Sequence, residues 1–216
     1  MADPIFWTNV GVDVQTALSP SIALSAVSKA AVGEATYTGS VNPAAGDYIV
    51  MSSQGMNEID ARVFRITGLD TATKKFLLDS EDTRDYQTFI GGSFQIITFG
   101  ASMRTAQTID TSGGDPEYTD VTTIHDQVRK RAPTVVSPMS MSMTNLFDLS
   151  DPAFIELNKA HKSKTKRAIR LRFGTGARML LTGYASAAGV PTGQAQGVVQ
   201  TKISIEAQNL PTVLSS

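Results

Sequence analysis

The feature that most constrains the fold is the alternation of apolar and polar side chains along segments of residues 134–216. A repeat of two residues places the apolar side chains on one face of a β-strand and the polar side chains on the other. The pattern occurs around the three methionines of 139–143, at 169–173, at 179–184 and at 199–207. Each strand therefore has one dry and one polar face, which predicts an antiparallel sheet that covers a core on one side only.

A helix interrupts these strands, and its start is marked by Asp151 and Pro152. The Asp151 carboxylate can accept hydrogen bonds from the first free N–H groups of a helix, and Pro152 suits the first helical position because it has no N–H. Apolar spacings of three and four follow, which predicts a helix over about 151–163 that flanks the sheet. The residues of this stripe are Phe154, Leu157 and His161.

The chain divides into three parts. We expect residues 1–21 to form an N-terminal arm and the first strand of the main domain. We expect residues 22–99 to form a small β-domain that is inserted into the main domain. Residues 100–216 predict the remainder of the main domain, with a long polar loop at 110–133 that lacks any repeat. The predicted fold class is mainly β: an antiparallel β-sandwich or barrel with one flanking α-helix and an inserted small β-domain.

Composition and charge narrow the classes of function. The chain has no cysteine, so it relies neither on disulfides nor on thiolate metal sites, and its net charge of −1 is not that of a general nucleic-acid binder. Residues 1–100 contain 6 Lys/Arg and 11 Asp/Glu, whereas residues 101–216 contain 13 and 9. This asymmetry is either ordinary surface variation or a sign that unlike surfaces meet when copies assemble. With an acidic start and no apolar run of ~20 residues, we expect a product made in the cytoplasm, without a membrane partner.

No arrangement of residues predicts catalysis, a cofactor or a metal site. The two histidines, His125 and His161, have no other histidine near them in the sequence, so ordinary surface and part-buried positions are favoured over metal ligation. The acidic turn at 79–85 does not have EF-hand spacing, and a solvated turn is favoured over a calcium site. The basic run at 159–172 could contact phosphate, but a helix end followed by the wet face of a strand explains it more simply.

The segments 147–152 with the helix that follows, 168–173, 180–184 and 202–214, together with the polar segment 116–133, resemble the tail tube proteins of long-tailed bacteriophages. In that family a small β-sandwich or barrel carries one helix, six copies form a ring, and the rings stack into a hollow tube through which DNA passes. The resemblance implies self-assembly and a place in the phage tail of the virion. It also implies contacts with the tape measure protein, the tail terminator and the distal tail protein, and an inserted domain on the outside, because the channel must stay clear.

Under this resemblance two groups of residues are candidates for assembly. The loop and the terminal arm are candidates for contacts between rings or subunits: Phe6, Trp7, Asp115, Asp120, Asp126, Arg129, Lys130 and Arg131. The polar strand faces are candidates for the lining of the channel: Ser140, Ser142, Arg170, Arg172, Lys202, Ser204 and Glu206. Because arginines attract passing phosphate, they could instead pair with acids such as Glu206 or lie at a subunit contact.

Two alternatives remain open at the level of the sequence. A neck or baseplate ring protein of the same fold would show the same strand pattern. A non-catalytic β binding module, of carbohydrate-binding or adhesin type, would need an aromatic platform, and the single tryptophan is Trp7.

Overall fold

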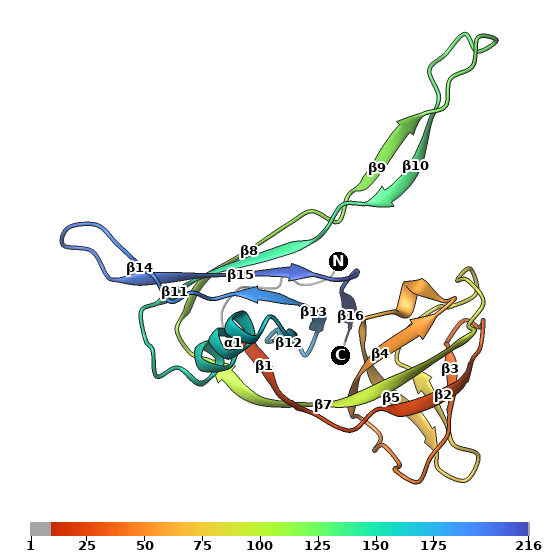
Figure 1. Cartoon of the computed structure of the whole chain (residues 1–216), viewed down its shortest axis with the longest axis horizontal. Helices are drawn as coiled ribbons and strands as arrows, with labels where there is room; N and C mark the ends of the chain where they lie inside the picture. The colour runs from red at the N-terminus through yellow and green to blue at the C-terminus, as the bar shows by residue number, and fades with distance from the viewer. Residues whose placement is uncertain (1–9, 216) are drawn as a thin grey trace.

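The computed structural model describes residues 10–215, which form two β-modules and an arm that projects from one of them (Figure 1). The prediction of a mainly β chain with one flanking helix is confirmed. The helical elements of the described part are α1 (Pro152–Ser163) and the short 3-10 turn η1 (Asn57–Ile59).

Six strands close into a small antiparallel barrel, in the order β2-β3-β6-β5-β4-β7, and the pairing of β2 with β7 completes the circle. Its interior holds Tyr37, Phe76 and Phe94, and the rings of the last two meet edge to face with their centroids 5.3 Å apart. This barrel contains the segment expected to be an inserted domain. Its strands are β2 (Ile22–Val27), β3 (Glu34–Tyr37), β4 (Tyr48–Gln54), β5 (Val63–Asp70), β6 (Lys75–Leu78) and β7 (Gly91–Met103).

The second module is a curved sheet that continues from β7 in the order β7-β1-β12-β13-β15-β11-β8. The first half of β7 pairs with β4 in the barrel and its second half pairs with β1, so one strand belongs to both modules. The predicted boundary between residues 99 and 100 therefore falls inside a strand. The remaining strands are β1 (Gly11–Leu18), β8 (Ala106–Ser112), β11 (Ser140–Leu146), β12 (Lys166–Arg172), β13 (Arg178–Ser186), β14 (Pro191–Thr192), β15 (Gln200–Ala207) and β16 (Thr212–Leu214).

Helix α1 packs on the apolar face of this sheet, against a core that contains Met141, Met143, Ile203 and Ile205. Asp151 caps it as the sequence predicts: one carboxylate oxygen accepts from the backbone N–H groups of Ala153 and Phe154, at 2.9 and 3.1 Å. The other oxygen accepts from Arg104 N and Thr105 Oγ1, at 2.9 and 3.2 Å, and so ties the helix start to the turn between β7 and β8. The buried residues of the helix are Ala153, Phe154, Leu157 and Ala160, and His161 is half-buried.

The segment 110–133, expected to be a loop, is instead part of a hairpin arm, formed by β9 (Pro116–Asp120) and β10 (Arg131–Val136). Gly113 and Gly114, with φ of 82° and 86°, turn the chain from β8 into the arm. A two-stranded ribbon that leaves the body is wet on both faces, so its strands need no apolar alternation. That is why pattern analysis misses them, and only residues 121–130 form the loop at the tip.

The two modules also share a core of their own beside β7. Tyr48, Val63 and Ile97 from the barrel pack against Ala168, Leu180 and Leu214 of the second module. Next to this core, Arg62 and Glu81 form a buried ion pair at 2.5 Å, and Arg62 also donates to Thr212 Oγ1 at 3.2 Å. The modules are therefore held together by a strand, a core and a polar contact.

Candidate assembly surfaces

The polar face opposite α1 extends across three neighbouring strands, β8, β11 and β15. The register pairs Ser140 with Glu206 and Ser142 with Ser204 across β11 and β15, so five of the seven channel candidates lie on one face. The structure adds β8, which sequence reasoning missed because its alternation is weak: Ser112 lies opposite Ser140, with their hydroxyl oxygens 2.9 Å apart. The residues of this polar face are Thr108, Asp110, Ser112, Ser140, Ser142, Thr144, Lys202, Ser204 and Glu206.

Arg170 and Arg172, the other two channel candidates, lie on β12 beside the junction of the modules and share one buried acid, Asp13. Asp13 is 2% exposed, and its carboxylate accepts from Arg172 Nε at 2.6 Å and from Arg170 Nε at 2.9 Å. The guanidinium of Arg170 also lies over two aromatic rings, 4.9 Å from the centroid of Tyr48 and 4.6 Å from that of Phe99. Their acid partner is thus Asp13 on β1 and not Glu206.

Burial by itself raises the pKa of the Asp13 carboxyl, but hydrogen bonds from Arg172, Ser102 and Arg170 outweigh burial and hold this pKa below its ordinary value. The carboxylate stays charged, and its single negative charge offsets half of the positive charge of the two arginines inside the monomer. This reduces the attraction for passing phosphate that free arginines would exert.

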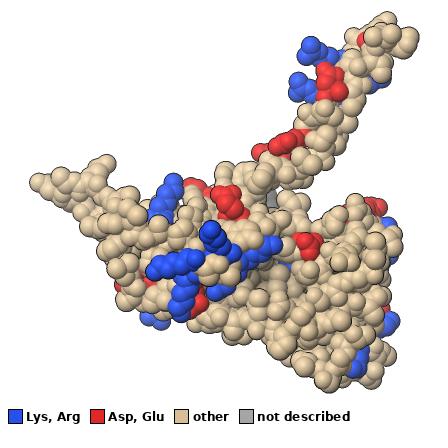
Figure 2. Space-filling model, in the orientation of Figure 1, with Lys and Arg blue, Asp and Glu red and all other residues tan. Residues whose placement is uncertain are grey.

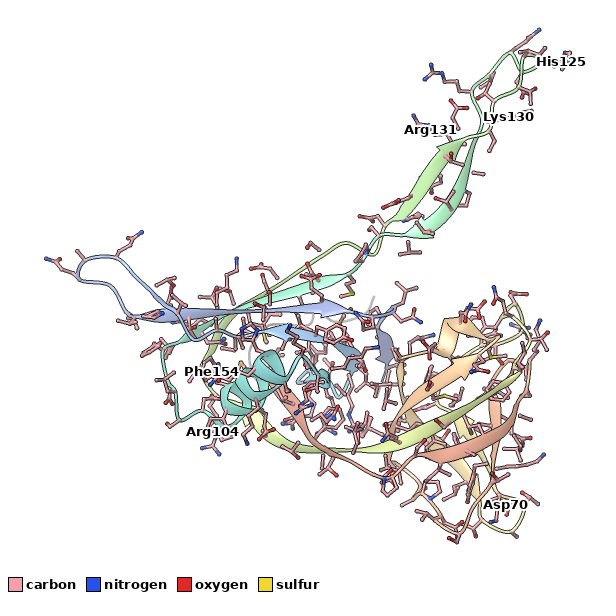
Figure 3. All side chains as sticks on the ribbon, viewed as in Figure 1. Asp70, Arg104, His125, Lys130, Arg131 and Phe154 are labelled. Carbon is pink, nitrogen blue, oxygen red and sulfur yellow. The ribbon has the colours of Figure 1, made fainter. Side chains whose placement is uncertain are left out.

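The six described candidates for contacts between subunits all lie on the arm, which stands clear of both modules (Figure 3). Near the tip, Asp126 accepts from the backbone N–H of Thr123 and from Lys130 Nζ, so its charge is already compensated. Ile124 at the tip is 96% exposed. The other members are Asp115, Asp120, Arg129 and Arg131, all exposed, while Phe6 and Trp7 lie outside the described residues.

Strand β8 forms an open edge of the sheet. It pairs with β11 on one side, and no strand among residues 10–215 pairs with its other side. A strand of seven residues with unpaired N–H and C=O groups is a template for pairing with another chain. Sequence analysis placed no assembly residue here, because nothing in the spacing of 106–112 marks an edge.

A cleft of about 550 Å³ lies where the barrel meets the second module. One wall comes from β4 and β7 of the barrel, and the other comes from β13 and the turn that joins α1 to β12. The turn carries Lys164 and the start of β12 carries Lys166 and Arg167, part of the basic run that gathers around α1 in Figure 2. The sequence shows these three basic residues, but it does not show that they lie beside a cleft, because the cleft forms only where the two modules pack together.

The candidate metal ligands and the helices of the described residues add no further site to these surfaces. Within 10–215, no three His, Asp or Glu side chains come together in a group that could hold a metal ion. His125 is at the tip of the arm and His161 is on α1. No helix in this part of the chain is long and apolar enough to cross a membrane.

The sequence is similar to a known protein family. A family model described as phage tail tube protein, TTP, matches residues 54–216, well over half of the chain. No curated protein matches the sequence.

Proposed function

The chain belongs to the phage tail tube protein family and is a structural component of the phage tail, and on that premise we propose that its copies close into rings, six to a ring. The rings stack into a hollow tube through which phage DNA passes. The mechanism is geometric and electrostatic, because the subunit supplies a wall and performs no covalent chemistry.

The open edge of β8 is the observation that carries this proposal. A sheet whose outer strand lacks a partner gains backbone hydrogen bonds by pairing with the sheet of a neighbouring copy. When each copy pairs head to tail with the next, the rotation between copies closes a ring that has no free edges. The ring then presents one face of this sheet to its centre.

The polar face of β8, β11 and β15 is the proposed channel lining, with Ser140, Ser142, Lys202, Ser204 and Glu206 as members. Hydroxyl groups on this face offer weak, exchangeable contacts, and Lys202 and Glu206 carry opposite charges. Arg170 and Arg172 lie at its margin with Asp13 as their counter-ion. A lining without a free cluster of cations lets DNA slide, because tight phosphate binding requires uncompensated positive charge.

The arm is the proposed contact between stacked rings, since it extends well beyond the body that forms a ring (Figure 1). Its described contact candidates are Asp115, Asp120, Asp126, Arg129, Lys130 and Arg131, and Phe6 and Trp7 of the terminal segment are proposed to add to it. The barrel is proposed to lie on the outside of the tube. The tape measure protein inside the tube, the tail terminator and the distal tail protein are the proposed partners at its centre and ends.

Electron microscopy and sedimentation of the purified chain at high concentration test the proposal. Hollow tubes with a ring repeat are the expected result. Closed single rings that never stack would instead favour a neck or baseplate ring protein of the same fold. A strictly monomeric chain under all salt and concentration conditions would overturn the assembly proposal.

A further inference from the structure

We propose that the cleft between the two modules is the docking site for strand β9 of a second copy. The inference rests on the proposed self-assembly and deepens it, because it names the two surfaces that meet. The cleft and the arm carry unlike charges that are left without ion pairs, and the two walls of the cleft differ in character.

The wall of the cleft on the second module is basic and uncompensated. Among the described residues, Lys164, Lys166 and Arg167 form no ion pair with an acid, although they line the cleft together. Arg167 Nη1 donates only to neighbouring oxygens of its own turn. The single acid of the lining, Asp60, accepts from the backbone N–H of Ser53.

Two buried polar atoms of residues that line the cleft also lack partners in the described structure. Thr182 is 6% exposed, and its Oγ1 has no hydrogen-bond partner. Arg167 Nε is likewise buried without a partner. Buried polar groups are paired in the great majority of native structures, so these atoms leave hydrogen-bonding capacity beside the cleft.

Strand β9 has the complementary character on its two faces. Because side chains alternate along a strand, Glu117 lies on one face and Pro116 and Tyr118 on the other, and Asp115 comes directly before the strand, two positions from Glu117. Neither Asp115 nor Glu117 forms an ion pair among the described residues, and Tyr118 is 58% exposed.

If the unpaired edge of β9 enters the cleft, one face of the strand meets the wall on the second module and the other face meets the wall on the barrel. The carboxylates of Asp115 and Glu117 would meet Lys164 and Lys166, while Tyr118 would meet the opposite side, where Leu18 and Val50 are partly exposed. An aromatic anchor beside unlike charges is a common centre of a protein interface. The cleft cannot be filled by the arm of its own chain, because that arm leads away from the body (Figure 1).

A charge-reversal experiment tests this contact. One variant carries Asp115→Lys with Glu117→Lys, a second carries Lys164→Glu with Lys166→Glu, and a third carries all four changes. The expected result is loss of tubes in the first two variants and recovery of tubes in the third, where the reversed arm meets the reversed cleft. A control with Lys29→Glu and Lys162→Glu makes the same change in net charge at exposed lysines outside the cleft and should assemble as the original chain does.

Circular dichroism of each variant separates lost assembly from lost folding, and site-specific crosslinking gives a second readout. The chain has no cysteine, so Tyr118→Cys with Leu18→Cys and a short bismaleimide should give a ladder of linked copies, while either single cysteine variant should not. Tubes of normal length in both reversed pairs, or no recovery in the fourfold variant, would overturn the contact while leaving the tube proposal intact. An original chain that never assembles would overturn both.

Discussion

At the scale of single residues, the most constrained charge is that of Asp13. Alternation along β1 assigns it to the polar face, yet it is as buried as its apolar neighbours Val12 and Val14. Two arginines from β12 make this burial tolerable, since a buried carboxylate is stable only when its charge is paired and hydrogen-bonded. Spacing in the sequence shows that Asp13 and Arg170 belong to strands, but not that those strands are neighbours.

Replacement of Asp13 by alanine should lower the free energy of unfolding by about 3 kcal/mol, because it leaves two partly buried guanidinium groups without their acid. Urea unfolding followed by circular dichroism measures this change. Ser102→Ala is the matched control: it removes one hydrogen bond to the same carboxylate, of 2.7 Å, and should cost about 1 kcal/mol. Equal effects of the two variants would contradict the central role of the ion pair.

The same carboxyl predicts acid sensitivity. Burial raises the pKa of Asp13, but the hydrogen bonds from Arg172, Ser102 and Arg170 prevail and hold the native pKa below 3.8, so the unfolded state binds more protons in this range. The contribution of Asp13 to stability is therefore present above its unfolded pKa and is lost as the pH falls through its native pKa. Urea unfolding from about pH 5 downward should show a shallower decline for Asp13→Asn than for the original chain. Identical slopes would be the contrary result.

At the scale of elements, the helix and strands that could be predicted from the sequence are those that bury one face. The helix and the strands around 139–143, 169–173 and 199–207 bury one face each, so apolar side chains recur along them at helical or strand spacing. The arm buries neither face, so β9 and β10 show no alternation of apolar and polar side chains that would predict a strand. The candidate residues on the arm were identifiable as charged, but the elements that hold them were not.

The cap of α1 gives a prediction for that element. Asp151→Ala should destabilise the protein by about 2 kcal/mol, because it removes the oxygen that accepts two hydrogen bonds from the helix N-terminus and the oxygen that accepts from Arg104 N and Thr105 Oγ1. Asp151→Asn retains one side-chain oxygen for the helix and should lose less. Thermal melting of both variants measures the difference, and an alanine variant as stable as the asparagine variant would argue against the cap.

Removal of the arm should separate folding from stacking. Deletion of residues 115–136 would join Gly114 to Ser137, which already lie in contact because Gly114 N donates to Ser137 O at 3.2 Å. None of the deleted residues belongs to a buried core, so the melting temperature should change little. In electron micrographs we expect rings or short assemblies in place of tubes. Tubes of normal length would transfer the stacking role to the terminal segment with Phe6 and Trp7.

At the scale of the whole molecule, we expect the two modules to fold as one unit. They share β7, the core around Leu180 and Leu214, and the contact of Arg62 with Thr212. The strands of residues 22–99 were predictable from their own sequence, but this shared core was not, because its residues come from distant parts of the chain: even Ile97 and Ala168 are 71 positions apart. The cleft beside the junction was beyond sequence analysis for the same reason.

Excision of the barrel tests this unity. A chain that joins residue 21 directly to residue 100 loses the part of β7 that pairs with β1 from Gln15 to Leu18. It also uncovers Ala168, Leu180 and Leu214, each at most 1% exposed in the complete chain. Exposure of a shared apolar core removes stabilisation in proportion to the area returned to water, so the shortened chain should aggregate or melt without a cooperative transition. Calorimetry of the complete chain should accordingly show a single transition. Two separate transitions, or a shortened chain that melts cooperatively and still forms tubes, would show instead that the barrel is an independent attachment to a self-sufficient tube domain.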